Sequence, residues 1–199
     1  TETLLLFARQ YPKVKLNVVY LPMEELMDRL QRREVDLVLA FKPHGHRFYN
    51  IDSHTLFNTY LSVIVGEGHS LAGRETITLQ ELQRYTLALP AHGMQARNSF
   101  EWLVKDSLLD FKANVELNSI SLLFKLVREG NIATVLNEAI IFGEMGLKAV
   151  SIDVPCGEKS MEGCVHVLKD SYMKNSARTF IKMLCETEST KLRAMEWIS

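Results

Sequence analysis

Cysteine, net charge and long apolar runs are all scarce in this sequence, and each scarcity excludes a class of protein. The three cysteines, Cys156, Cys164 and Cys185, cannot all pair, and a chain of 199 residues does not need disulfides to hold its core. We therefore expect a reducing compartment, the cytoplasm. A formal net charge of −1 argues against a concentrated basic surface that would grip nucleic acid. Every apolar run is shorter than the roughly 20 residues that cross a bilayer, so no membrane contact is expected.

What the sequence does have is the residue balance of a folded domain. Hydrophobic residues make up 47% of it and charged residues 24%, and the length is enough for one large or two small domains. The chain begins at Thr1 already inside a helical pattern, with no initiator methionine. We therefore expect a fragment of a longer polypeptide, with any further domain upstream.

Residues 111–137 predict a strand–helix–strand unit. Val115 and Leu117 alternate with polar neighbours, as in a short strand. Asn118 and Ser119 can both cap the helix that follows, because a short side-chain oxygen accepts from the free N–H groups of the first turn. Such a parallel crossover puts polar residues at the carboxyl end of its first strand, where open α/β sheets bind ligands. An ordinary unit without a ligand has the same pattern.

The remaining elements alternate between helices and strands. Helices are expected where capping residues precede an apolar stripe, and strands where apolar or β-branched residues run together or alternate. The expected helices are residues 4–10, 24–30, 79–82, 100–108, 120–128, 139–145 and 175–184. The expected strands are residues 14–21, 34–41, 56–65, 85–89, 115–117, 132–136, 147–154 and 164–168.

The residue sets that indicate catalysis or a cofactor are missing. There is no Ser, His and Asp set at recognisable spacing, no Gly-rich phosphate loop and no pair of carboxylates recurring on one face. His44 and His46 could share a metal, but no Cys or Asp partner stands beside them, so a loop coincidence is the simpler interpretation. We expect no enzyme activity, no cofactor and no metal.

Several motifs, in their order and spacing, resemble the effector-binding domain of LysR-type transcriptional regulators. They extend over roughly residues 4–186 and comprise Tyr11-Pro12 after a helix, Val35 to Leu39, Leu56-Phe57, His69 to Ala72, Glu116 to Ser119, Val127 to Gly130 and Phe180-Ile181. The sequence departs from the family at Arg33 and Ile132, where the family usually has Gly, and at Ser70 and Asn137, where it usually has Pro.

The resemblance implies an α/β type 2 periplasmic-binding-protein fold, with two Rossmann-like subdomains and a central cleft. By analogy, regulatory subdomain I would be residues 1–86 and 163–199, and subdomain II residues 87–162. A small-molecule effector would bind in the cleft, and DNA would be bound only through an upstream helix-turn-helix domain absent from this chain. The resemblance also implies a homo-oligomer, a dimer or, in the full-length protein, a tetramer, to which the apolar residues of the tail 187–199 could contribute. The alternatives are a solute-binding protein of an uptake system and an enzyme on the same fold.

Two strand–loop–helix junctions form the predicted ligand-binding site. Helix N-termini suit a small anionic or polar effector, and an arginine there could add a bidentate contact. The predicted residues are His92, Gly93, Met94 and Arg97 at the first junction and Asn118, Ser119 and Ile120 at the second. Two alternatives stay open: Arg97 is only a surface residue of its helix, and Asn118 and Ser119 are only helix caps. On the ligand interpretation, Arg97→Ala weakens an anionic ligand but leaves stability nearly unchanged.

Overall fold

The structure, a computed structural model, describes residues 2–43 and 48–186. The histidine pair His44 and His46 and the apolar tail 187–199, both considered in the sequence, lie outside the described residues. The chain divides into two compact units, unit 1 (Thr1–Asn58 and Glu162–Ser199) and unit 2 (Thr59–Met161). Residues 59–86 group with unit 2, because their strands pair with strands of that unit, whereas the family resemblance implies a boundary after residue 86.

Unit 1 is built around three neighbouring strands in the order β1–β8–β2. β1 (Val38–Phe41) pairs antiparallel with the last part of β8 (Ser160–Leu168), and β2 (Ile51–Gly66) begins in this unit. Helix α2 (Met23–Gln31) buries Met23, Met27 and Leu30 against Val38 because these residues recur at helical spacing. Helices α1 (Glu2–Gln10) and α7 (Asn175–Glu186) pack together, with the Phe7 and Phe180 ring centroids 5.3 Å apart.

Unit 2 contains a mixed sheet whose strands follow the order β5–β4–β6–β2–β7–β3. β4 (Ala88–Pro90) pairs parallel with β5 (Val115–Leu117) and bridges toward β6 (Thr134–Asn137) through Leu87 and Ala133. β6 and β7 (Leu147–Ile152) both pair antiparallel with β2, and β3 (Thr76–Ile77) is parallel to β7. All strands except β2 therefore run in one direction, and their carboxyl ends share one edge.

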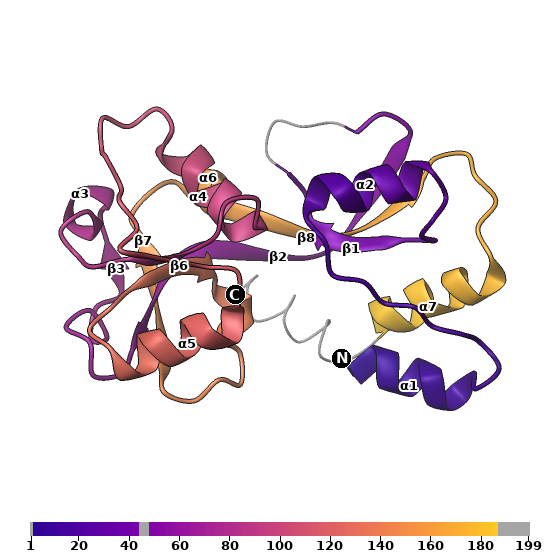
Figure 1. Cartoon of the computed structure of the whole chain (residues 1–199), viewed down its shortest axis with the longest axis horizontal. Coiled ribbons are helices and arrows are strands. Elements are labelled where there is room, and N and C mark those ends of the chain that lie inside the picture. Colours follow the sequence, from indigo (N-terminus) through magenta and orange to yellow (C-terminus); the bar gives the residue numbers. More distant parts are fainter. Residues whose placement is uncertain (1, 44–47, 187–199) are drawn as a thin grey trace. The chain divides into compact units, whose positions relative to one another are not determined.

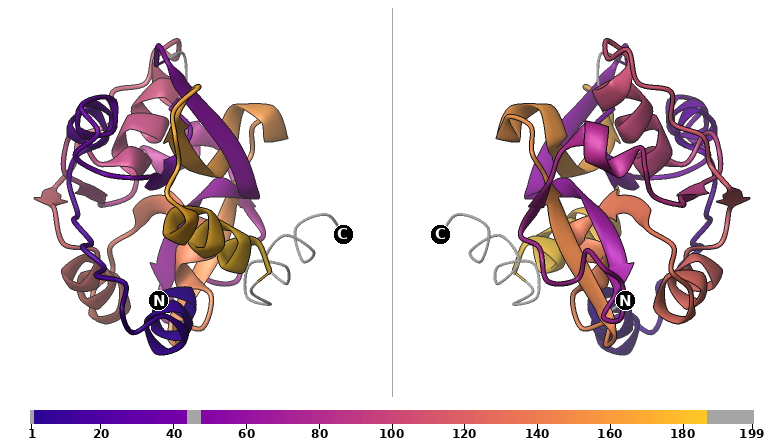
Figure 2. Two further views of the ribbon diagram at one scale, coloured as in Figure 1. Left: turned by 90° about the vertical axis from the view of Figure 1, so that its right-hand side faces the viewer. Right: turned by 90° about the vertical axis from the view of Figure 1, so that its left-hand side faces the viewer.

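Helices α4 (Gln95–Val104) and α5 (Ile120–Glu129) lie on opposite faces of this sheet (Figure 1, Figure 2). The chain moves outward from β4 to β5 through α4 and returns from β5 to β6 through α5. Because crossovers between parallel strands are right-handed, a reversal of direction puts the two helices on opposite faces. The predicted strand–helix–strand unit at 111–137 is confirmed, as is the predicted helix at residues 79–82, α3 (Leu79–Leu82), which begins after a capping box between Thr78 and Glu81.

Two predicted elements are wrong. Residues 14–21 form no strand, and Val18 and Tyr20 are 55% and 93% exposed, because β-branched and aromatic residues make a strand only where a partner takes up the backbone hydrogen bonds. Residues 139–145 form only the end of the 3-10 turn η1 (Glu138–Ile141), since Gly143 and Gly146 take φ values of +81° and +79° that a helix cannot accommodate. A single helical turn, α6 (Cys156–Lys159), precedes β8.

Candidate functional site

The two predicted junctions lie next to each other at the carboxyl edge of the unit 2 sheet. β4 and β5 are neighbouring parallel strands, and the helices that follow them leave toward opposite faces. This is a topological switch point, the place where open α/β sheets leave a crevice beyond the strand ends. His92, Gly93 and Met94 follow β4, and Asn118, Ser119 and Ile120 follow β5, so the structure brings both halves of the predicted site to one edge.

The first junction is a tight turn that leads into α4. Gly93 has a φ of +86°, a conformation that glycine adopts without steric cost. Met94 is the N-cap residue of α4 and makes no side-chain capping hydrogen bond. The positive end of α4 therefore lacks the usual side-chain oxygen from its N-cap.

The second junction distinguishes between the two predicted capping residues. Ser119 is the N-cap of α5, and its Oγ accepts from the Leu122 N–H at 3.4 Å. The Asn118 side chain is exposed and forms no hydrogen bond with any described residue, so it stays available to a ligand. Ile120 is half-buried and opens the helix.

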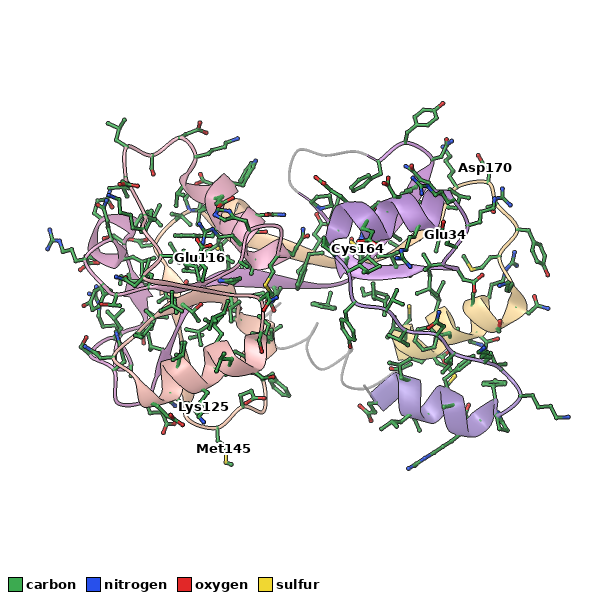
Figure 3. All side chains as sticks on the ribbon, viewed as in Figure 1. Glu34, Glu116, Lys125, Met145, Cys164 and Asp170 are labelled. Atoms are coloured by element: carbon green, nitrogen blue, oxygen red, sulfur yellow. The ribbon has the colours of Figure 1, made fainter. Side chains whose placement is uncertain are left out.

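Arg97 is buried, with its side chain 9% exposed, and its guanidinium joins three elements of unit 2. Its Nε donates to Glu101 Oε1 at 2.6 Å within α4, and its Nη1 donates to Glu116 Oε1 on β5 at 3.2 Å. The imidazole of His92 adds the loop, with Nδ1 2.9 Å from Glu101 Oε1 and Nε2 3.3 Å from Arg97 Nη2. Because a guanidinium only donates, this geometry fits an imidazole with its proton on Nδ1. Figure 3 labels Glu116 inside unit 2.

This network changes what the first junction offers a ligand. With a neutral imidazole, the carboxylates of Glu101 and Glu116 and the guanidinium of Arg97 carry a net charge of −1. The positive charge of Arg97 is therefore already balanced, and Arg97 is not the surface residue that the sequence left as an alternative. The pairing of Glu101 and Glu116 with Arg97 is not among the contacts predicted from the sequence. The i,i+4 spacing of Arg97 and Glu101 was a usable signal, whereas the contact with Glu116 depends on the adjacency of β4 and β5.

Further polar groups that the sequence did not indicate lie at the same edge, where β2 enters unit 2 and β6 ends. Ser62 is fully buried, and its Oγ donates to Glu138 Oε2 at 3.0 Å. Thr59, also fully buried, accepts at Oγ1 from the Ala139 N–H at 3.3 Å. Asn137, at the end of β6, is 8% exposed. The carboxyl edge of the sheet is thus polar across β2 and β6 as well as β4 and β5.

The described residues hold no group of three His, Cys, Asp or Glu side chains that could bind a metal. In the same part of the chain, every helix is too short or too polar to span a membrane.

Comparison with known proteins identifies the family. The protein-family model for the LysR substrate binding domain matches residues 1–188. The regulatory domain of CcmR from Synechocystis PCC6803, solved in complex with 2-PG, has a TM-score of 0.80 at 20% identity, over 93% of this chain and 88% of that one. The effector binding domain of QuiR, in complex with shikimate, has a TM-score of 0.74 at 16% identity, over 93% and 88%.

A longer relative is HinK, a LysR family transcriptional regulator from Pseudomonas aeruginosa, with a TM-score of 0.73 at 20% identity. The match covers 96% of this chain but 66% of HinK. These similarities extend over almost the whole chain. The chain therefore has the mixed α/β, type 2 periplasmic-binding-protein-like fold of these domains. The chain belongs to the LysR substrate-binding domain family, whose members sense ligands in transcription regulators.

Proposed function

We propose that this domain binds a small polar or anionic effector at the carboxyl edge of the unit 2 sheet and thereby controls DNA binding by an upstream helix-turn-helix domain. The observation that carries the proposal is the switch point between β4 and β5, where two helix N-termini and the free side chain of Asn118 meet. The 2-PG and shikimate bound by the related CcmR and QuiR domains support a small effector.

The proposed contacts divide into two groups. His92, Gly93, Met94, Asn118, Ser119 and Ile120 meet the effector, and any anionic group on it meets the helix N-termini of α4 and α5. Arg97 contributes chiefly by holding His92 and Glu116 in place, since its guanidinium is already paired with two carboxylates. The exposed part of Glu116 then favours effectors that also carry hydrogen-bond donors.

The wider assembly is also a proposal. We infer a cytoplasmic homodimer without catalytic activity, in which DNA is bound only by the full-length protein. Family membership and the exposed Leu5 and Leu6 of α1, 56% and 38% exposed, support an apolar contact between copies. Light scattering at tens of micromolar tests the dimer; a monomer alone contradicts it.

A thermal-shift screen with small carboxylates and other polar metabolites identifies the effector. A ligand at about a hundred times its dissociation constant adds roughly 2.7 kcal/mol to the unfolding free energy. Calorimetry then compares Asn118→Ala with Asn131→Ala, the same substitution at an exposed position before β6, at the opposite edge of the sheet. We expect only Asn118→Ala to weaken binding, by roughly 1 kcal/mol for one lost hydrogen bond. Equal affinities, or ligand-induced NMR shifts outside both junctions, would contradict the site.

A further inference from the structure

Unit 1 carries a depression at the end of its sheet where β2 begins and β8 ends. It has a volume of about 390 Å³ and is lined by Gln31, Arg33, Tyr49, Asn50, Leu168 and Lys169. These residues come from the end of α2, the turn before β2 and the end of β8. We call this site the basic depression; its volume is in the range that holds small metabolites.

Hydrogen bonds join the three segments that form the walls. The Lys169 N–H donates to the Asn50 carbonyl at 2.8 Å, and Gln31 Nε2 donates to the Tyr49 carbonyl at 3.3 Å. Among the described residues, the non-glycine positions with positive φ are Arg33, Asn50 and Asp170, at +61°, +59° and +51°. Two of them line the depression and the third follows Lys169, so its backbone frame is held before any ligand binds.

Arg33 is not the residue that its backbone position favours. The Arg33 N–H donates to Leu30 and the Glu34 N–H to Arg29, which is the hydrogen-bond pattern of a Schellman motif at the end of α2. Glycine ends such a helix without steric cost, and the related domains usually have glycine here, whereas arginine meets a clash at its Cβ. The side chain at position 33 is therefore not needed to end the helix.

The charges of the depression favour an anion. Arg33 and Lys169 form no ion pair with any described residue, and no carboxylate is among the lining residues. Gln31, Tyr49 and Asn50 add amide and hydroxyl donors. Glu34 and Asp170, labelled in Figure 3, follow the two cations in the sequence and are exposed. A long polyanion such as nucleic acid would also meet these two carboxylates, whereas a compact oxyanion needs contacts only with the two cations.

We propose that the basic depression is a second ligand site that takes a small oxyanion, inorganic phosphate or the phosphate of a small phosphomonoester. It is separate from the effector site proposed for unit 2. Asn50 immediately precedes β2, which continues to Thr59 before it enters unit 2. At about 3.3 Å per residue, this strand puts the depression roughly 30 Å from the point of entry.

The test is an NMR titration of the labelled 199-residue chain with inorganic phosphate, against sodium chloride at matched ionic strength. Saturable shifts are expected for the amides of residues 31–34, 49–51 and 168–170 with phosphate only. The double variant Arg33→Gly and Lys169→Gln removes both cations and puts glycine at the strained position, so its fold is retained. We expect it to weaken phosphate roughly tenfold or more, because two charge-assisted contacts are lost. Arg32→Gln, which removes a neighbouring exposed cation outside the lining, leaves the affinity unchanged.

Several results would overturn the proposal. One is chemical shifts that rise linearly with salt and equally for phosphate and chloride. Another is a phosphate affinity that is unchanged in the double variant. A third is an Arg32→Gln variant that loses as much phosphate affinity as the double variant. Shifts confined to unit 2 would also overturn it, while leaving the proposed effector site intact. Displacement of phosphate by a short DNA duplex that binds more tightly would assign this surface to nucleic acid instead.

Discussion

The guanidinium of Arg97 joins α4, the loop before it and β5, and its removal affects all three. We predict that Arg97→Met lowers the unfolding free energy by about 1–2 kcal/mol, since two carboxylates and an imidazole lose their shared partner. The loss of stability is small because the side chains of Glu101 and Glu116 are 44% and 43% exposed, so water can solvate them once Arg97 is removed. This replaces the expectation that a substitution at Arg97 leaves stability nearly unchanged.

Urea denaturation measures the effect. Arg84→Met is the matched control, because Arg84 is exposed and forms no ion pair with the described residues. A surface substitution of this kind stays within about 0.5 kcal/mol of the parent. If Arg97→Met and Arg84→Met have the same stability, the network does not hold the junction together.

The imidazole of His166 makes the stability of unit 1 depend on pH. It is completely buried on β8, with Nε2 3.2 Å from the Ala40 carbonyl and Nδ1 2.7 Å from Ser53 Oγ. Because a carbonyl only accepts, Nε2 carries the proton and Nδ1 accepts from the serine hydroxyl. Burial lowers the pKa of His166 more than the Ala40 carbonyl raises it, and burial also lowers the pKa of His69.

The sign of the pH effect follows from these directions. A folded-state pKa below the unfolded value of about 6.5 means that the unfolded chain binds more protons as the pH falls below that value. Stability is therefore greatest above about pH 6.5 and falls as the pH drops toward the folded pKa. Denaturant midpoints at several pH values between 7.5 and 5 measure the slope. His166→Gln should flatten it, and His54→Gln, at an exposed position, should not. If stability depends on pH equally in both variants, His166 is not the source of the pH dependence.

At the scale of elements, the end of β2 and the end of α5 are in close backbone contact. A Cβ added at Gly66 would lie 2.6 Å from the Val127 carbonyl oxygen and 3.2 Å from that of Arg128. Gly66 is therefore the position where helix and sheet meet. Gly66→Ala should destabilise the chain by about 1–3 kcal/mol, because the helix has to move away.

Gly68→Ala is the matched control, since a Cβ there has no heavy atom within 4 Å. Thermal unfolding of the two variants compares them directly. If Gly66→Ala unfolds at the same temperature as Gly68→Ala, α5 is not held at this distance from β2.

At the scale of the whole molecule, the balance of charge limits what the chain can bind. With a net charge of −1 and several of its arginines paired to carboxylates, such as Arg29, Arg74 and Arg128, we predict no binding of duplex DNA at physiological salt. A fluorescence-anisotropy titration with a labelled duplex checks this. Micromolar binding that weakens as salt is added would contradict it.

Interactions between residues close together in the chain could be predicted from the sequence. The caps at Thr78 and Ser119 join residues three apart, and the apolar stripe of α5 repeats every turn, so both follow from local geometry. The strand–loop–helix junctions follow in the same way. The family resemblance added the fold and the role as a ligand sensor, which the family match confirms.

Contacts between distant segments were decided only by the tertiary structure. Glu116 meets Arg97 because β5 pairs beside β4, and the order of strands in a sheet is not encoded in any one segment. The apolar stretch 14–21 forms no strand because a strand also needs a partner edge, which its own residues do not supply. A local pattern determines which conformations a segment favours, whereas backbone pairing and burial depend on what the rest of the chain brings beside it.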